Sequence, residues 1–271
     1  MPELPEVETT RQGIAPLVEN QTIAKIVIHQ AKLRWPIPGS LRQKLPGQTI
    51  HSVTRRAKYL LFNTSAGTLL IHLGMSGSLR FVHQSTPLDT HDHFELVLTN
   101  QNSLRLRDPR RFGAVLWAGD QPEQHKLLAG LGPEPLEPHF TGDYLYRRSR
   151  KRKRAIRDFL LDGHMVAGIG NIYANEALFT AGIRPTRAVG RISRDRYQKL
   201  VRAIRSTLRR AIKAGGTSIR DFRQADGRPG YFQHSLKIYG KKGEPCPKCD
   251  RKIRAIKLTN RTVFVCTHCQ L

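Results

Sequence analysis

The sequence predicts an α+β protein of more than one domain, and three observations carry that prediction. Short β-branched or alternating apolar runs occupy residues 22–119, helical apolar periodicity occupies 171–212, and all four cysteines lie between 246 and 269. At 271 residues the chain is long enough for two compact domains and a small additional module. We expect an N-terminal helix, an antiparallel β-sandwich or barrel, a helical domain and a metal-stabilised hairpin, in that order.

The first ten residues admit two compatible interpretations. Pro5 suits the first turn of a helix, and the glutamates that follow it suit the positive end of the helix dipole. If Met1 is removed, Pro2 carries a free secondary amine, a useful fraction of which is unprotonated near neutral pH. Such an amine can attack a sugar C1′ and form an iminium, with Glu3 beside it to move the proton. With Met1 attached, the Pro2 nitrogen is an amide and this chemistry is excluded.

Four segments of the N-terminal half have the pattern of strands. Residues 22–28 are β-branched, 69–73 form a short apolar run, and 93–98 and 103–107 alternate with period two. Turn residues separate these segments, as in an antiparallel sandwich or barrel. The proline-rich stretch 131–138 then predicts a linker and a domain boundary.

The second half begins with a basic block and continues with helical patterns. Residues 147–154 are basic except for one serine, which suits either a solvated surface or contacts with phosphates. A helical pattern over 171–180 is closed by Gly182, and the glycines before it could form a phosphate cradle, although an ordinary turn has the same pattern. A second helix is expected from Ser193, with an apolar stripe to 212.

The C-terminal segment carries the most specific motif of the chain. Two CxxC pairs separated by sixteen residues have the spacing of a tetrahedral structural zinc site. Zinc favours thiolates, and so small a module cannot fold on its hydrophobic core alone. A redox dithiol is the alternative, and His268 is interpreted as a bystander between two ligands. The expected ligands of one Zn²⁺ are Cys246, Cys249, Cys266 and Cys269.

The charge of the chain points to a polyanion as its partner. Lys and Arg number 46 against 21 Asp and Glu, which gives a formal net charge of +25. Nucleic acid is the commonest polyanion, and the cysteine-containing module is itself basic. A membrane surface is the rival partner, but the sequence has neither a long apolar run nor a basic amphipathic helix with aromatic residues. No signal peptide is expected, so we predict a soluble intracellular protein.

Six motifs, in the same order, resemble those of bacterial formamidopyrimidine-DNA glycosylases, which excise oxidised purines. Together they cover nearly the whole chain and are far more specific than any one of them. They are 2–9, 55–60, 72–77, 108–113, 168–173 and the cysteine module. The resemblance implies a bifunctional DNA glycosylase and abasic-site lyase of base excision repair. It would remove 8-oxoguanine and formamidopyrimidines from duplex DNA through a Schiff base on the N-terminal proline, then cleave the strand by β,δ-elimination.

The same resemblance implies roles for individual residues. Pro2 is similar to the nucleophile and Glu3 to the acid/base residue beside it. Lys58 resembles the lysine that supports β-elimination, and Arg261 resembles the arginine associated with δ-elimination. The side chains that fill the gap left by a flipped base would be Met75, Arg110 and Phe112, and the phosphate contacts would be His91, Arg152 and Asn171. Without the family, Met75 and Phe112 would be taken as core and Lys58 or Arg110 as phosphate contacts.

The resemblance also divides the chain into three expected domains. Residues 1–132 would form the catalytic β-sandwich and 133–232 a helix–two-turn–helix DNA-binding domain. Within the latter, 217–232 resembles the mobile loop over the extruded lesion. Residues 233–271 would form the zinc module. We expect a monomer in the bacterial cytoplasm that binds damaged double-stranded DNA and no membrane.

Two alternatives remain open from the sequence. An endonuclease VIII-like member of the same superfamily would prefer oxidised pyrimidines, and only the resemblance of Leu4, Val7 and the gap-filling set favours the purine branch. A non-catalytic zinc-ribbon DNA-binding protein is the alternative of another class. This alternative would hold if Met1 stays attached, because the positive charge of the chain and its zinc ribbon would still bind DNA.

Overall fold

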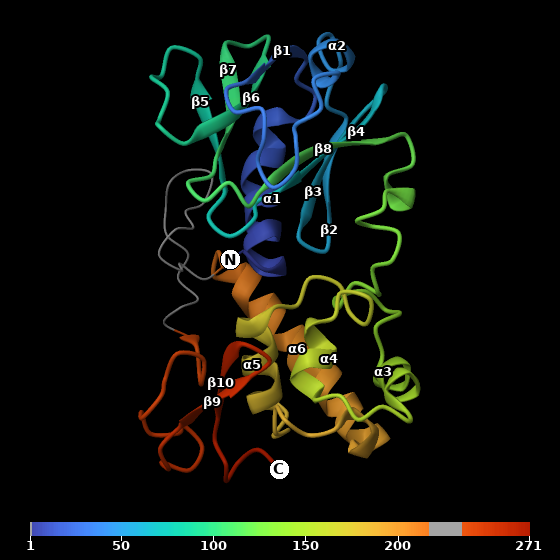
Figure 1. The fold of residues 1–271 in the computed structure, drawn as a ribbon, viewed down its shortest axis with the longest axis vertical. Coiled ribbons are helices and arrows are strands. Elements are labelled where there is room, and N and C mark those ends of the chain that lie inside the picture. Colours follow the sequence, from blue (N-terminus) through green and yellow to red (C-terminus); the bar gives the residue numbers. More distant parts are fainter. Residues whose placement is uncertain (1, 217–234) are drawn as a thin grey trace. The chain divides into compact units, whose positions relative to one another are not determined.

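The computed structural model describes residues 2–216 and 235–271, which divide into two compact units (Figure 1). Unit 1 contains residues 2–129 and 214–216, and unit 2 contains 130–213 and 235–271. The helical segment and the cysteine module therefore belong to one compact unit. The domain ranges 1–132, 133–232 and 233–271 stay predictions, and the predicted lesion loop at 217–232 lies outside the described residues.

Unit 1 starts with helix α1 (Leu4–Val18), as the N-terminal pattern predicts. Glu3 and Glu6 form a capping box, in which the Glu3 N–H donates to Glu6 Oε2 at 2.9 Å. Pro5 lies in the first turn, where a missing N–H costs nothing because that group has no partner within the helix. The helix continues to Val18 through Pro16 and buries one apolar face.

Two four-stranded antiparallel sheets complete unit 1 and confirm the predicted sandwich (Figure 1). One has the order β1-β6-β7-β5, with β1 (Ile23–Ile28), β5 (Ser78–His83), β6 (Asp92–Leu98) and β7 (Asn102–Arg107). The other has the order β2-β3-β4-β8, with β2 (Ser52–Arg56), β3 (Tyr59–Thr64), β4 (Gly67–His72) and β8 (Ala114–Gly119). Helix α1 and both sheets contribute to one apolar core. The short helices α2 (Leu41–Lys44) and η1 (Pro122–Gln124) lie between and after the strands.

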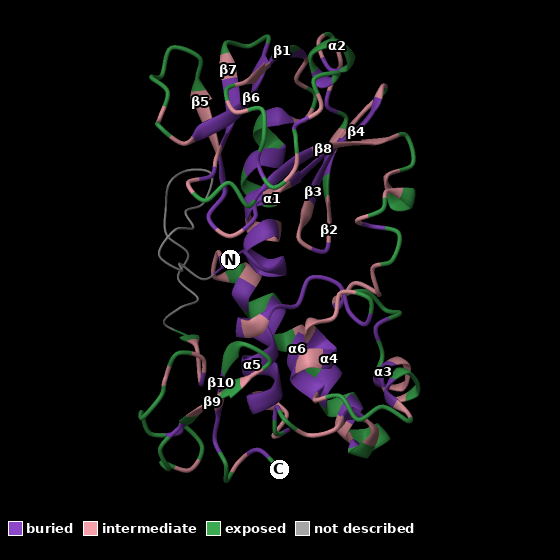
Figure 2. Ribbon diagram, viewed as in Figure 1, coloured by how far each residue is buried: buried purple, intermediate pink, exposed green. Residues whose placement is uncertain are grey.

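Unit 2 contains the helices α3 (Gly142–Ser149), α4 (Ile156–Leu161), α5 (Asn171–Thr180), η2 (Val189–Arg191) and α6 (Arg194–Lys213). Helix α5 has the predicted bounds, and Gly182 follows it with a φ of +66°, as a closing glycine requires. Ser193 Oγ accepts the Arg196 N–H at 3.4 Å at the start of α6. Figure 2 shows α5 mostly buried, whereas α6 alternates between buried and exposed bands. No helix within 2–216 or 235–271 is both long and apolar enough to cross a membrane.

The predicted hairpin closes unit 2. Strands β9 (Arg254–Leu258) and β10 (Arg261–Val265) pair antiparallel. Both residues of the turn between them, Thr259 and Asn260, have positive φ, the conformation that matches the twist of a two-residue hairpin. The module has a small core that includes Phe179 of α5, so a helix supplies part of the apolar surface that the module lacks.

Candidate active site and zinc centre

Pro2 and Glu3 are buried at the start of α1. The side chain of Glu6 holds the Glu3 N–H, so the capping box fixes the direction in which the chain leaves the helix toward Pro2. A nucleophilic N-terminal nitrogen needs this kind of fixed position.

Lys58 lies in the two-residue turn between β2 and β3, after Ala57, which has a φ of +53°. Arg55 connects this turn to α1: its Nη1 donates to the Ala57 carbonyl at 2.9 Å and its Nε to Glu8 Oε2 at 3.0 Å. Burial acts to raise the pKa of Glu8, but bonds and charges from Arg11 and Arg55 outweigh it, so the pKa lies below its ordinary value. An ionised pair therefore links the turn of Lys58 to the helix that starts beside Pro2.

The three predicted gap-filling side chains lie together in unit 1. A pocket of about 370 Å³ is lined by Arg34, His72, Gly74, Met75 and Phe112. Phe112 is 45% exposed, and the Arg110 guanidinium carbon lies 4.9 Å from the centre of its ring. Met75 and Phe112 therefore share one pocket, and Arg110 stacks on its rim.

His72 belongs to a motif noted in the sequence, yet no role was predicted for it. Its Nδ1 accepts the Gly74 N–H at 3.0 Å, so the neutral ring carries its proton on Nε2. Burial, followed by the charges of Lys58 and Arg34, lowers the pKa of His72 to about 4. At neutral pH the ring is thus an uncharged N–H donor near two cations. Arg34 was missed as well, because nothing in its sequence context indicates a site.

His91 lies just before β6, and its ring is partly exposed. Its backbone carbonyl accepts the Asp108 N–H at 3.0 Å. This bond places His91 beside the segment 108–113, which carries Arg110 and Phe112. Four of the residues expected to contact DNA therefore lie on neighbouring segments of unit 1.

In unit 2, Asn171 and Arg261 come from adjoining elements. Asn171 is the first residue of α5, and its Nδ2 donates to the Thr262 carbonyl at 3.0 Å. Thr262 directly follows Arg261 on β10, so this bond brings the predicted phosphate contact and the predicted δ-elimination residue together. Arg152 lies apart from this pair in the contacts of the described residues: it is exposed, and its backbone bonds to Ser149 and Gly190.

Helix α4 holds the turn that precedes Arg261. Arg157, whose side chain is 1% exposed, donates to the Leu258 carbonyl and pairs with Asp158 at 2.7 Å. Asp158 in turn accepts the Thr259 hydroxyl at 2.7 Å. A pocket of about 330 Å³ beside this contact is lined by Arg154, Arg157, Asp158, Leu161, Thr259 and Arg261. Three arginines line the pocket, and Arg261 lies at the start of β10, directly after the turn that α4 supports.

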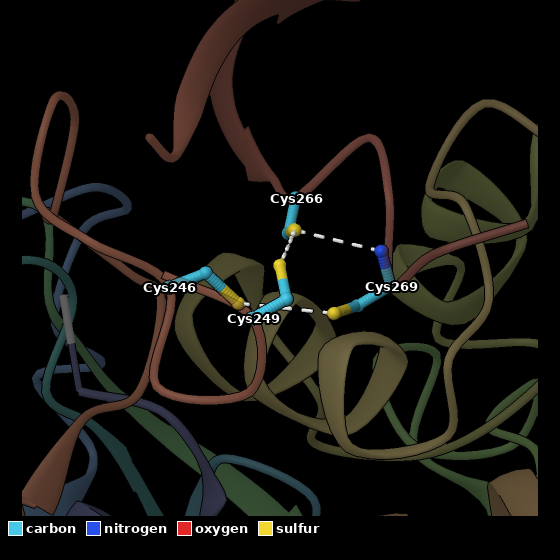
Figure 3. Close-up of side chains that lie close together, drawn as sticks. All are labelled: Cys246, Cys249, Cys266 and Cys269. Carbon is cyan, nitrogen blue, oxygen red and sulfur yellow. Dashed lines mark hydrogen bonds between the residues drawn. The ribbon is translucent and has the colours of Figure 1, made fainter. Parts of the chain in front are cut away.

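The four cysteines meet in one cluster, with their sulfur atoms within 4.8 Å of one another (Figure 3). Cys246 Sγ lies 3.9 Å from Cys269 Sγ, and Cys249 Sγ lies 3.5 Å from Cys266 Sγ. A tetrahedron with zinc–sulfur bonds of about 2.3 Å has edges of about 3.8 Å, so the cluster fits one zinc ion. A zinc ion bound here would join the two ends of a module that has little core of its own.

Comparisons with known proteins cover the chain almost from end to end. Residues 1–115 match the formamidopyrimidine-DNA glycosylase N-terminal domain, 131–223 match the formamidopyrimidine-DNA glycosylase H2TH domain, and 243–271 match the zinc finger found in FPG and IleRS. The last match and the four-sulfur cluster together confirm the predicted zinc site.

Relatives and solved structures agree with these matches. Formamidopyrimidine-DNA glycosylases of Marinobacter nauticus and Syntrophotalea carbinolica are each 54% identical over 270 residues, covering 100% of both chains. The MutM (Fpg) protein of Thermus thermophilus matches with a TM-score of 0.89 at 38% identity, covering 99% of this chain and 98% of that one. Lactococcus lactis Fpg in complex with abasic-site DNA matches with a TM-score of 0.92 at 33% identity, covering 99% of both. The chain therefore belongs to the formamidopyrimidine-DNA glycosylase family of base excision repair.

Proposed function

We propose that this chain is a bifunctional glycosylase and abasic-site lyase that excises 8-oxoguanine and formamidopyrimidines from duplex DNA. The observation that carries the proposal is the burial of Pro2 and Glu3 at a capped helix start, with the turn of Lys58 connected to the same helix. Family membership supports the glycosylase activity. One related Lactococcus lactis structure contains Fapy-dG DNA and another contains abasic-site DNA. These two DNAs correspond to the substrates of the two proposed steps, base excision and strand cleavage.

The reaction starts once removal of Met1 has freed the Pro2 amine. The Pro2 nitrogen attacks C1′ of the damaged nucleotide, and the bond from C1′ to the base breaks with its electron pair going to the base. Proton transfer to the sugar ring oxygen opens the ring and leaves a cationic iminium between Pro2 and C1′. Glu3, next to Pro2 in the chain, carries protons in these steps.

Strand cleavage uses the iminium as an electron sink. Removal of a proton from C2′ expels the 3′ phosphate, which is β-elimination, and Lys58 supports this step. A second proton loss, at C4′, expels the 5′ phosphate in δ-elimination, which we assign to Arg261. Water then hydrolyses the iminium and restores the amine. Zinc has a structural role only: it holds the hairpin on which Arg261 lies.

Access to C1′ requires the nucleotide to leave the base stack, at a cost of a few kcal/mol. Met75 and Phe112 replace part of the lost stacking, while Arg110 bonds to the orphaned partner base. His91, Arg152 and Asn171 contact phosphates, and the net charge of +25 supplies non-specific affinity. The protein acts as a cytoplasmic monomer on damaged double-stranded DNA.

Borohydride trapping tests the nucleophile. The purified protein, whose intact mass must show the loss of Met1, is incubated with 8-oxoguanine duplex and borohydride. A covalent protein–DNA adduct is expected, and Pro2→Gly should weaken trapping sharply. Trapping that persists in Pro2→Gly but disappears in Lys58→Ala would move the nucleophile to Lys58.

The substrate panel should include an oxidised pyrimidine. One Lactococcus lactis Fpg structure contains DNA with such a lesion, so the purine preference proposed for this chain needs a direct comparison. Single-turnover excision should be faster for 8-oxoguanine than for the oxidised pyrimidine in the same sequence. The reverse order would favour the endonuclease VIII-like alternative.

A further inference from the structure

Asp108 connects three segments of unit 1 from a fully buried position. It follows β7 and is 0% exposed. Its Oδ1 accepts the Ser76 hydroxyl at 2.8 Å, and its Oδ2 accepts the Gly113 N–H at 2.7 Å. Its backbone N–H donates to the His91 carbonyl at 3.0 Å. One residue is thus bonded to the segments that carry Met75, His91 and the pair Arg110 and Phe112.

Ser76 extends this network to the backbone of a gap-filling residue. It is 3% exposed, and its Oγ accepts the Arg110 N–H at 3.2 Å while it donates to Asp108. Ser76 is also the chain neighbour of Met75. A single hydroxyl therefore spans the two loops 73–77 and 108–113, whose chain positions are more than thirty residues apart.

Close backbone packing fixes how the two loops fit together. Gly74 has a φ of +64°, and a Cβ at this position would lie 2.4 Å from both the Gly113 nitrogen and the Phe112 carbonyl carbon. A Cβ on Gly113 would lie 2.9 Å from Asp108 Oδ2. Only glycine fits at either position, because both sites are occupied by backbone or by the buried carboxylate.

We propose that Asp108 and Ser76 are positioning residues that hold Met75, Arg110 and Phe112 as one preorganised wedge. The inference rests on the proposed function, since the wedge role of these three side chains is part of it. Neither positioning residue can touch DNA directly, because both are buried. Phe112 is 45% exposed, so packing around its ring restrains it only in part. The hydrogen bonds of Asp108 and Ser76 to the loop backbone therefore set the position of this side chain. A wedge fixed before binding avoids the ordering cost at the moment of base extrusion.

Ser76→Ala is the first test, and Ser103→Ala is its matched control. Ser103 is a buried serine on β7 whose hydroxyl donates a long hydrogen bond to the Leu96 carbonyl, at 3.5 Å. Ser76→Ala removes both the bond to Asp108 and the bond from the Arg110 N–H, and it should slow single-turnover excision of 8-oxoguanine from duplex at least about tenfold. Cleavage at a preformed abasic site should change less than threefold, and Ser103→Ala should leave both rates unchanged. Asp108→Asn, which loses one acceptor oxygen, should reproduce the Ser76→Ala result.

A readout specific to positioning comes from the Phe112→Ala background. If Ser76 acts through the wedge, adding Ser76→Ala to Phe112→Ala should slow excision much less than tenfold. A 2-aminopurine next to the lesion should also show slower unstacking in Ser76→Ala, which a loss of fold alone would not produce at unchanged melting temperature. Equal losses on lesion and abasic substrates, or full additivity with Phe112→Ala, would overturn the proposal. A wild-type protein that excises no oxidised purine would instead refute the proposed function.

Discussion

Truncation of Phe112 should separate base extrusion from strand cleavage, if the proposed role of its ring is right. Its ring is 45% exposed and makes a cation–π contact with Arg110, so Phe112→Ala removes a half-buried ring and one weak contact. Partial burial is worth about 1 kcal/mol and the cation–π contact about 0.5–1 kcal/mol. The variant should therefore fold, with a free energy of unfolding lower by about 1–2 kcal/mol. If the ring fills the gap left by the flipped base, as proposed, it contributes about 1–3 kcal/mol of stacking on DNA.

This difference predicts two unequal rates. Excision of 8-oxoguanine from duplex should slow by about one to two decades, because base extrusion loses the stacking partner. Strand cleavage at a preformed abasic site should slow by less than threefold, because no base has to leave the stack. Both rates are measured under single-turnover conditions at saturating enzyme. Leu17→Ala, on α1 and 40% exposed, is the matched truncation of an exposed apolar side chain and should change neither rate.

Equal losses on the two substrates would contradict the wedge assignment. They would mean that Phe112 supports the fold or general DNA affinity, and the pocket it shares with Met75 would be a packing feature. An unfolding free energy lowered by much more than 2 kcal/mol would point the same way. In either case Arg110, which lies over the ring, would need a new role.

Three further changes test other parts of the structure. Cys246→Ala should abolish binding of about one zinc per chain and weaken DNA binding, while unit 1 stays folded; metal analysis and circular dichroism check this. Arg157→Ala should lower the free energy of unfolding by about 3 kcal/mol, whereas exposed Arg154→Ala should lower it by less than about 1 kcal/mol; urea titrations compare them. Folding lowers the pKa of His72 to about 4. As the pH falls below about 6.5, the unfolded chain therefore binds a proton at this ring while the folded chain does not. Stability present at neutral pH is thus lost between about pH 6.5 and 4, and His72→Gln should reduce that loss in urea titrations at pH 7 and 5.

The sequence predicts well the elements whose signal is local. Helix α5 has the expected bounds, α6 starts after its expected cap, and β1 and β7 follow their apolar patterns. Strands β2 and β5 were missed because arginines interrupt them, whereas β3 and β8 were missed although their apolar runs are as long as the one at 69–73. In β2 the exposed and charged positions hide a strand that is defined by its pairing with β3. Pairing partners are long-range information that periodicity does not contain.

Helix α3 illustrates the same limit in unit 2. Its sequence ends in the basic block 147–154, which has no apolar period strong enough to indicate a helix. The helix is capped by Thr141, whose Oγ accepts the Tyr144 N–H at 3.1 Å, and it packs against α6. Tertiary packing thus decides a segment whose own composition suggests only a solvated surface or a phosphate contact.

The sequence indicated the individual residues of the candidate site. It did not indicate the hydrogen bonds and ion pairs that hold those residues in position. Motif resemblance indicated Lys58, Met75 and Phe112, while nothing indicated the Arg55 link to α1 or the role of Asp108. Both are polar ties between segments far apart in the chain. The local sequence around a buried carboxylate looks the same whether the carboxylate bonds within one loop or links two loops. Only the three-dimensional structure distinguishes these two cases.

The chain has few acidic residues, and several of them connect segments of the fold through hydrogen bonds or ion pairs. With 21 acidic residues against 46 basic ones, a chain that binds DNA cannot place many carboxylates on its surface without repelling phosphate. Several of its acids are instead buried and support backbone or arginine groups. Glu176, 0% exposed, accepts the N–H groups of residues 237–239. Glu8 and Asp158 are partly buried and pair with arginines beside predicted catalytic residues. In this chain, Glu8, Asp158 and Glu176 therefore serve mainly to connect segments through hydrogen bonds and ion pairs.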